Sequence, residues 1–410
     1  MEGDMMAALG RAAVEGHSLF GHSASGRPDA PFRLERTPGG SHAADERVRA
    51  TFIELPQARQ TCAVLGGRPG GSWGYCHGVI EHGVAGGCTR LRTRLRLDAP
   101  GLTGPDLVRL ALERGQTARQ ALEAVTGLIA RHGQGAFPGC PDDQGHDAAI
   151  LLADAHEAFL VEASGPAWVY QEVGEVRAAG DVCTIRQDWD AIAPGLAGRV
   201  IARGWWPEDG SKLDFAGALD EGTTGRALRR WGQATRLLVE QSGHIDAVFL
   251  RRALADHFEG PAGEVGPRPP ASVSSLVAAI GGALPVAWCA FGPPSSAVFL
   301  PLFPAGELPL ALADHGDLAA RVARPGAAAR RTAPGGRHQP ALEGLQALLD
   351  AEAAEFLAEA AALRRERRDG ELRRQATLFM QHAWEEFAEV TDGLLHDSPS
   401  PDDSVQLSVF

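Results

Sequence analysis

The spacing of apolar positions predicts a helical hairpin over residues 102–135. The first helix begins after Thr103, whose hydroxyl suits the cap of a helix N-terminus. Three of its apolar residues fall on one helical face, namely Leu107, Leu110 and Ala111. The second helix begins after Thr117, where Gln120 completes a capping-box pattern, and ends at Gly133.

Elsewhere, alternating and β-branched positions predict strands. In the first part of the chain these strands are Met5–Leu9, Ser18–His22, Val48–Leu55 and Thr61–Gly66. Residues 148–180 predict a meander of four short strands joined by turns. Helical segments dominate from Gly222 to Glu259, and strands return from Ser272 to Leu302. Short strands in two groups, flanked by paired helices, indicate a layered design of helices and sheets.

The composition changes after residue 322. Residues 323–340 are rich in Ala, Arg, Gly and Pro, which is typical of a linker. Residues 341–396 carry two helical stripes of apolar side chains, and residues 397–410 have the composition of a disordered tail. We therefore expect one domain over residues 1–322 and C-terminal helices over residues 341–396 that pack on it.

Charge and composition exclude several classes of protein. The 410 residues carry a formal net charge of −13, and the arginines are scattered among acidic residues, so no basic footprint for nucleic acid is present. The N-terminus has acidic residues where a signal peptide needs positive charge. The most apolar later stretch, residues 278–303, is interrupted by prolines and is not a membrane span. The six cysteines are widely spaced, as expected of reduced thiols in a cytoplasmic protein.

The segment Ser72–Cys88 raises two alternatives for its chemistry, because it combines two cysteines, two histidines and a glutamate. A metal site would draw on Cys76, His77, His82 and Cys88, but the paired spacing of zinc sites is absent. Cys76 could instead be a nucleophile with His77 or His82 as its base. The apolar Val79 and Ile80 favour a half-buried strand, in which a cysteine acts as a small hydrophobe. We expect no metal and no cofactor.

Several blocks of the chain resemble, in order, the secernins and their bacterial relatives, the cysteine dipeptidases of the N-terminal-nucleophile (Ntn) hydrolase fold. The hairpin over residues 102–135 is similar almost position by position. Further similar blocks are residues 66–84, 151–169, 176–185 and 271–303, with the C-terminal helices. The resemblance implies an α+β fold of four layers, αββα, with two stacked, mostly antiparallel sheets between helical layers. It also implies amide hydrolysis by an N-terminal cysteine whose own α-amine acts as the base.

This chain departs from the family at the residues that carry the chemistry. Gly3 stands where the family has its cysteine, and Asp4 follows it. The family's Asn-Ser-Asp-Arg-Pro motif reads ASGRP here, which keeps Arg27 and loses the aspartate. Ile80 and Asp181 stand where the family has two asparagines. The hydrocarbon side chain of Ile80 donates no hydrogen bond, and the carboxylate of Asp181 repels a developing oxyanion.

These departures predict a pseudoenzyme without catalytic residues. Its ligand would be a peptide-like small molecule or a protein partner, held in the old cleft by Asp4, Arg27, Ile80 and Asp181. An active dipeptidase remains the alternative, with a start site elsewhere or with Cys76 as nucleophile, and a purely structural role is the third possibility. The segment with Arg226, Arg229, Arg230 and Arg236 is predicted to be a solvated helix face, the alternative being a clamp for a substrate carboxylate. Homo-oligomerisation stays open.

Overall fold

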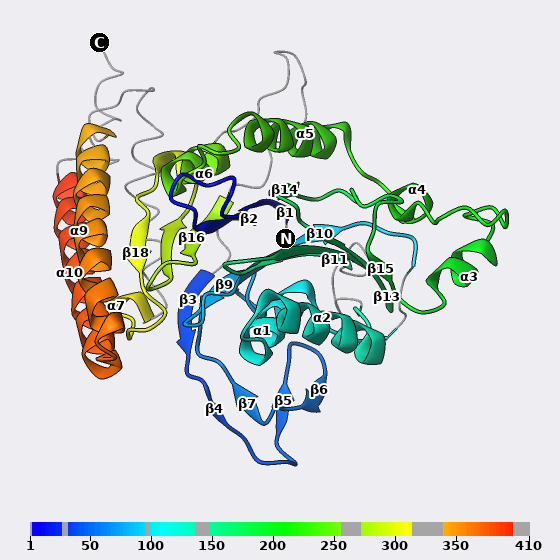
Figure 1. Ribbon diagram of the computed structural model, residues 1–410, viewed down its shortest axis with the longest axis horizontal. Helices are drawn as coiled ribbons and strands as arrows, with labels where there is room; N and C mark the ends of the chain where they lie inside the picture. The colour runs from blue at the N-terminus through cyan, green and yellow to red at the C-terminus, as the bar shows by residue number, and fades with distance from the viewer. Residues whose placement is uncertain are drawn as a thin grey trace, which may run out of the picture.

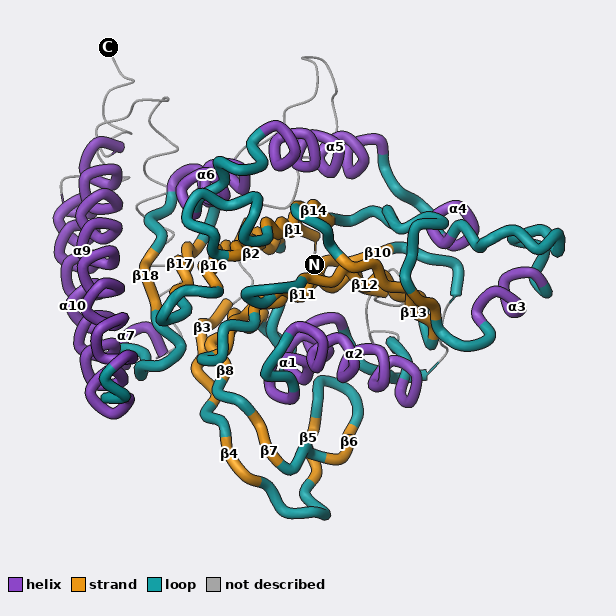
Figure 2. Tube along the Cα trace, viewed as in Figure 1, coloured by secondary structure: helices purple, strands orange, loops and turns teal. Residues whose placement is uncertain are grey.

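Two β-sheets lie face to face between layers of helices in a computed structural model of the chain (Figure 1). The structure describes residues 2–26, 32–95, 99–135, 147–255, 272–313 and 339–396. Seen edge-on in Figure 2, the strands form two stacked layers with helices above and below them. The predicted α+β fold of four layers, αββα, is therefore confirmed.

The first sheet has six antiparallel strands in the order β14-β1-β2-β16-β17-β18. Its strands are β1 (Glu2–Ala8), β2 (Ser18–Ser25), β14 (Val176–Ala179), β16 (Ser272–Ile280), β17 (Val286–Phe291) and β18 (Leu300–Leu302). Helices α5 (Gly225–Glu240) and α6 (Ala247–Ala255) cover its outer face. This sheet carries the residues aligned with the family's nucleophile.

The second sheet has eight antiparallel strands in the order β15-β13-β12-β11-β10-β9-β8-β3. Its strands are β3 (Phe32–Thr37), β8 (Val64–Pro69), β9 (His77–Ile80), β10 (Ala85–Leu91), β11 (Asp147–Ala153), β12 (Ala158–Ser164), β13 (Ala167–Glu172) and β15 (Ala191–Ile192). Helices α1 (Gly104–Arg114) and α2 (Ala118–His132) cover its outer face. Two small two-stranded sheets extend from this side, β4 (Gly40–Ser41) with β7 (Gln60–Thr61) and β5 (Arg47–Arg49) with β6 (Glu54–Pro56).

The last two helices, α9 (Gln339–Arg365) and α10 (Asp369–His396), form a hairpin beside the edge strand β18 (Figure 1). The side chain of Gln346 accepts a hydrogen bond from the backbone of Phe299 and donates one to its carbonyl. Phe303 meets Phe356 and Phe379 in a cluster of rings with centroids 4.8–5.4 Å apart. These contacts join the hairpin to the first sheet. Most of the predicted linker and the whole predicted tail lie outside the described residues.

Short elements complete the chain between these layers. They are the helices α3 (Leu196–Ile201), α4 (Phe215–Leu219) and α7 (Leu310–Ala313) and a 3-10 turn at Pro294–Ser296. In the part of the chain that the structure describes, no helix is long and apolar enough to cross a bilayer. The cysteines described there are buried free thiols, namely Cys62, Cys76, Cys88, Cys183 and Cys289.

The helical hairpin follows the sequence pattern closely. Thr103 caps α1 with a complete capping box. Its hydroxyl oxygen accepts from the Asp106 amide, and the Asp106 carboxylate accepts from the Thr103 amide. Thr117 caps α2, but the side chain of Gln120 accepts from the amide of Gln116, one residue earlier than a capping box requires. The prediction for the second helix is therefore right about its cap but wrong about the second hydrogen bond that completes a capping box.

Three strand predictions need correction. The segment Thr61–Gly66 is not one strand, because Thr61 ends β7, which pairs with β4, and β8 of the second sheet begins at Val64. The segment Val48–Leu55 is the turn of the β5–β6 hairpin and not one strand, because the chain reverses between Arg49 and Glu54. The meander over residues 148–180 does contain four strands, but only the first three are neighbours in the second sheet. The fourth, β14, crosses to the first sheet and pairs with β1. This crossing brings Asp181 next to the start of β1.

Candidate functional site

Gly3 lies in β1 in a position that leaves no room for a side chain. A Cβ atom built on it would lie 2.3 Å from the carbonyl oxygen of Ser23 and 2.9 Å from Nε2 of His22. Its backbone nitrogen is a peptide amide that donates a hydrogen bond to Oδ1 of Asp181 at 3.0 Å. Gly3, the residue that the resemblance aligns with a nucleophile, therefore has no thiol, and its nitrogen is a peptide amide in this structure.

A polar cluster surrounds this amide, and we refer to Asp4, Asp181 and Arg230 as the acid–arginine cluster. Arg230 reaches Oδ2 of Asp4 at 2.7 Å and Oδ2 of Asp181 at 3.6 Å. Thr89 on β10 donates to Oδ1 of Asp181. The side chains of the cluster are 13–21% exposed, so solvent screens their attraction only in part. One guanidinium thus bridges two carboxylates at the N-terminal end of β1.

The prediction of a solvated helix face is wrong for Arg230. Helix α5 turns Arg230 toward β1 and β14, together with the buried Ala234 and Leu238. The neighbouring Trp231 donates its indole N–H to the carbonyl oxygen of Ala178 on β14 at 3.2 Å. Arg226 is exposed, as predicted. The spacing of four residues from 230 to 234 to 238 was the available signal for this inward stripe.

The structure does not bring Ile80 to the acid–arginine cluster. In β9, His77 and Val79 face the first sheet, so Gly78 and Ile80 face the helices α1 and α2. A Cβ atom on Gly78 would lie 3.0 Å from Cδ1 of Leu112 on α1. Ile80 packs in that apolar layer and does not line the space around Gly3. Arg27, the remaining predicted ligand-binding residue, lies outside the described residues.

The candidate ligands of the segment Ser72–Cys88 are separated by the same alternation. Cys88 faces α1, and burial raises the pKa of its thiol to about 12. His82 is exposed on the turn between β9 and β10. Cys76 is fully buried, its thiol donates to the carbonyl oxygen of Gly67 at 3.3 Å, and burial raises its pKa well above the ordinary value. A protonated, inaccessible thiol is a poor nucleophile.

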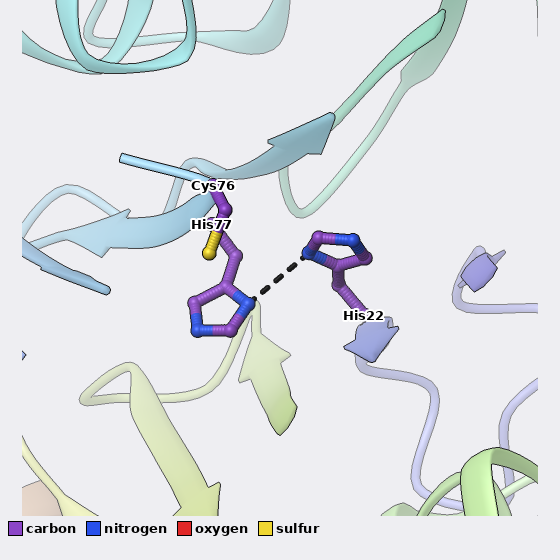
Figure 3. Close-up of side chains that lie close together, drawn as sticks. All are labelled: His22, Cys76 and His77. Carbon is purple, nitrogen blue, oxygen red and sulfur yellow. Dashed lines mark hydrogen bonds between the residues drawn. The ribbon is translucent and has the colours of Figure 1, made fainter. Parts of the chain in front are cut away.

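His77 instead meets a residue that the sequence reasoning missed. Its Nδ1 lies 3.1 Å from Nδ1 of His22 on β2, and its Nε2 lies 3.2 Å from the hydroxyl of Ser274 (Figure 3). Both rings are fully buried between the sheets. Burial lowers the pKa of His77 to about 3, and burial together with the nearby His77 lowers that of His22 well below its usual value. Both imidazoles are neutral at physiological pH.

A cavity of about 140 Å³ adjoins the acid–arginine cluster on the other side of β10. The glycine turn after β8, the start of α1 and the residues Thr89, Arg90 and Asp147 line it. Within the part of the chain that the structure describes, Nε and one terminal nitrogen of Arg90 are buried without a hydrogen-bond partner. The carboxylate of Asp147 accepts from Thr93 and from the amide of Gly165. Arg90 and Asp147 thus place one basic and one acidic side chain in the wall of the cavity.

Comparison with known proteins gives the following. No family model matches the chain. Among solved structures it is similar to a variant of conjugated bile acid hydrolase from Clostridium perfringens, at 11% identity and a TM-score of 0.45, over 73% of this chain and 92% of that one. It is similar to penicillin V acylase from Agrobacterium tumefaciens, at 12% identity and a TM-score of 0.40, over 73% and 86%. A third is the N-acylethanolamine-hydrolyzing acid amidase ortholog of Caenorhabditis elegans, at 10% identity and 0.31, over 68% and 93%. No activity follows from likenesses at this level.

Proposed function

We propose that this chain is a secernin-like homologue of the dipeptidase family that binds a peptide-like small molecule and does not hydrolyse it. The observation that carries the proposal is Gly3, which has no side chain, no space for one, and an amide hydrogen bond to Asp181. We further propose that the protein acts in the cytoplasm.

The surroundings of Gly3 also oppose amide hydrolysis. Attack on an amide creates an oxyanion, which needs hydrogen-bond donors or positive charge around it. Here the side chains around Gly3 include the imidazole of His22 and the carboxylates of Asp4 and Asp181, and a carboxylate repels a developing negative charge. Losing a covalent nucleophile forfeits several powers of ten in rate, and this cluster offers nothing to replace it.

The cavity beside Thr89 supports the binding half of the proposal. A peptide-like molecule carries a carboxylate and amide or ammonium N–H groups. Arg90 lines the cavity and suits the carboxylate, because a guanidinium binds such a group through parallel hydrogen bonds. The carboxylate of Asp147 also lines the cavity and is an acceptor for N–H groups. Satisfying buried donors in this way favours a bound ligand over an empty cavity.

Binding can be tested with a set of Ala-Xaa dipeptides, measured by calorimetry. We expect Arg90→Met to weaken binding of the best dipeptide by roughly 10–100-fold, since a hydrogen bond to a charged group contributes about 1.5–3 kcal/mol. Arg92→Met is the matched control, because Arg92 lies on the same segment with an exposed side chain. Equal affinity for the wild type and Arg90→Met, or an equal loss in both variants, would contradict the proposed site.

A further inference from the structure

His22, Cys76 and His77 form a group of potential metal ligands buried between the two sheets. One ligand atom from each lies within 4.8 Å of the other two, and all three residues are fully buried. Figure 3 shows the two imidazole rings meeting at their Nδ1 atoms, with the sulfur of Cys76 beside His77. His22 comes from β2 of the first sheet, whereas the other two belong to the second sheet. The group therefore spans the interface of the sheets.

We propose that this group binds one Cu(I) ion through Nδ1 of His22, Nδ1 of His77 and Sγ of Cys76. The site is independent of the proposed ligand cavity, which lies on the other face of the second sheet. Binding exchanges the thiol proton of Cys76 for the ion and releases that proton to solvent, with no change of oxidation state.

The distances are close to those of a coordinated ion. Two imidazole nitrogens on one ion with bonds of about 2.0 Å are roughly 3.3–3.5 Å apart. The two Nδ1 atoms are 3.1 Å apart, so only a small separation is needed. A nitrogen and a sulfur on one ion are about 3.6 Å apart, and the ligand atoms of the group lie within 4.8 Å of one another, so any nitrogen–sulfur separation above about 3.6 Å must shorten. Rotation of the Cys76 side chain away from its bond to Gly67 is a way to achieve this.

The surroundings of His77 fit ligation through its Nδ1. A metal-bound imidazole needs a partner for its other nitrogen, and Nε2 of His77 has one in the hydroxyl of Ser274 at 3.2 Å. Nε2 of His22 is buried and has no hydrogen-bond partner among the described residues. Ligation of His22 through Nδ1 places its remaining N–H on this Nε2, so the outer hydrogen bond of the site comes from His77 and Ser274.

The donor set favours Cu(I) over Zn(II). Thiolate and imidazole are soft to intermediate donors, and three of them suit Cu(I), whereas Zn(II) takes four. A thiolate with Cu(I) is electrically neutral, which suits an apolar interior, whereas Zn(II) would leave a buried positive charge. Met5 adds a thioether nearby, because it is the direct cross-strand partner of His22 and is fully buried.

The test is anaerobic titration of the full-length protein with Cu(I) against a chromogenic Cu(I) chelator. It is run on the native protein and on protein refolded with the ion, because the site is buried. We expect the wild type to bind one equivalent of Cu(I). Cys76→Ser and His77→Gln should each lose about 100-fold or more in Cu(I) affinity, because removing a ligand has a larger effect than changing a residue that only hydrogen-bonds to a ligand. Cys289→Ser is the control, a buried thiol of the first sheet that is not in the group.

Three results would overturn the proposal. The first is binding of less than one equivalent of Cu(I) by both the native and the refolded wild type. This result does not depend on whether any variant folds. The second is unchanged affinity in a folded Cys76→Ser protein. The third is displacement of Cu(I) by an equal concentration of Zn(II), which would assign the site to a different ion.

Discussion

Replacing Gly3 by cysteine is expected to lower the free energy of unfolding by roughly 2–3 kcal/mol and to produce no hydrolysis, because the new side chain is forced against backbone. Its Cβ atom would lie 2.3 Å from the carbonyl oxygen of Ser23, and a carbonyl in a sheet cannot turn aside as a flexible side chain can. Urea denaturation measures the change. Gly40→Cys is the matched control, since a Cβ atom on that strand glycine meets nothing within 4 Å.

Two further changes would seem to restore the family's residues, Ile80→Asn and Asp181→Asn. The first places an amide in the apolar layer against α1 and α2, where it has no access to Gly3. We therefore expect the triple variant to be less stable than Gly3→Cys alone and equally inactive. A Gly3→Cys protein as stable as the wild type, with a thiol that reacts rapidly with a peptide-like electrophile, would contradict the closed position described here.

Replacing Arg230 by methionine is expected to cost about 3 kcal/mol of stability. The change keeps the approximate length of the side chain but leaves Asp4 and Asp181 without the cation that they share. Removing one partner of a fully buried ion pair costs roughly 3–5 kcal/mol, and this cluster is largely buried. Chemical denaturation at pH 7 measures it. Arg226→Met is the control, because Arg226 is exposed one turn earlier on the same helix.

A triple variant separates the charge effect from lost packing. Adding Asp4→Asn and Asp181→Asn to Arg230→Met removes the two carboxylates that Arg230 contacts, while the amide oxygen introduced at position 181 would still accept from the Gly3 backbone N–H. We expect this to recover most of the lost stability. If Arg230→Met lowers the free energy of unfolding no more than Arg226→Met does, the acid–arginine cluster makes no measurable contribution to stability at the N-terminal end of β1.

Local sequence signals predicted the elements that depend on neighbours in the chain. Thr103 and Thr117 set the starts of α1 and α2, and both caps form as expected. The cluster at Gly3 depends instead on contacts between distant segments. Asp181 reaches β1 only because β14 crosses between sheets, and Arg230 comes from a helix that follows the second sheet in the chain.

The faces of buried strands were the weakest part of the prediction. Each residue of β9 is buried, so apolarity alone does not reveal that His77 faces one layer and Ile80 the other. His22 gave no signal for the same reason, because every residue of β2 is buried and a lone histidine there has no pattern. Only the pairing of the two sheets places His22 against His77.

Hydrolysis of dipeptides by the purified wild-type protein tests most directly whether Gly3 has replaced the nucleophile. The protein is incubated at high concentration with the Ala-Xaa dipeptides, and the release of free amino acids is followed by mass spectrometry. We expect no release above that of a buffer blank, in the wild type and in Cys76→Ala alike. Release by the wild type that disappears in Cys76→Ala would contradict the binding role and identify the buried thiol as the nucleophile of an active amide hydrolase.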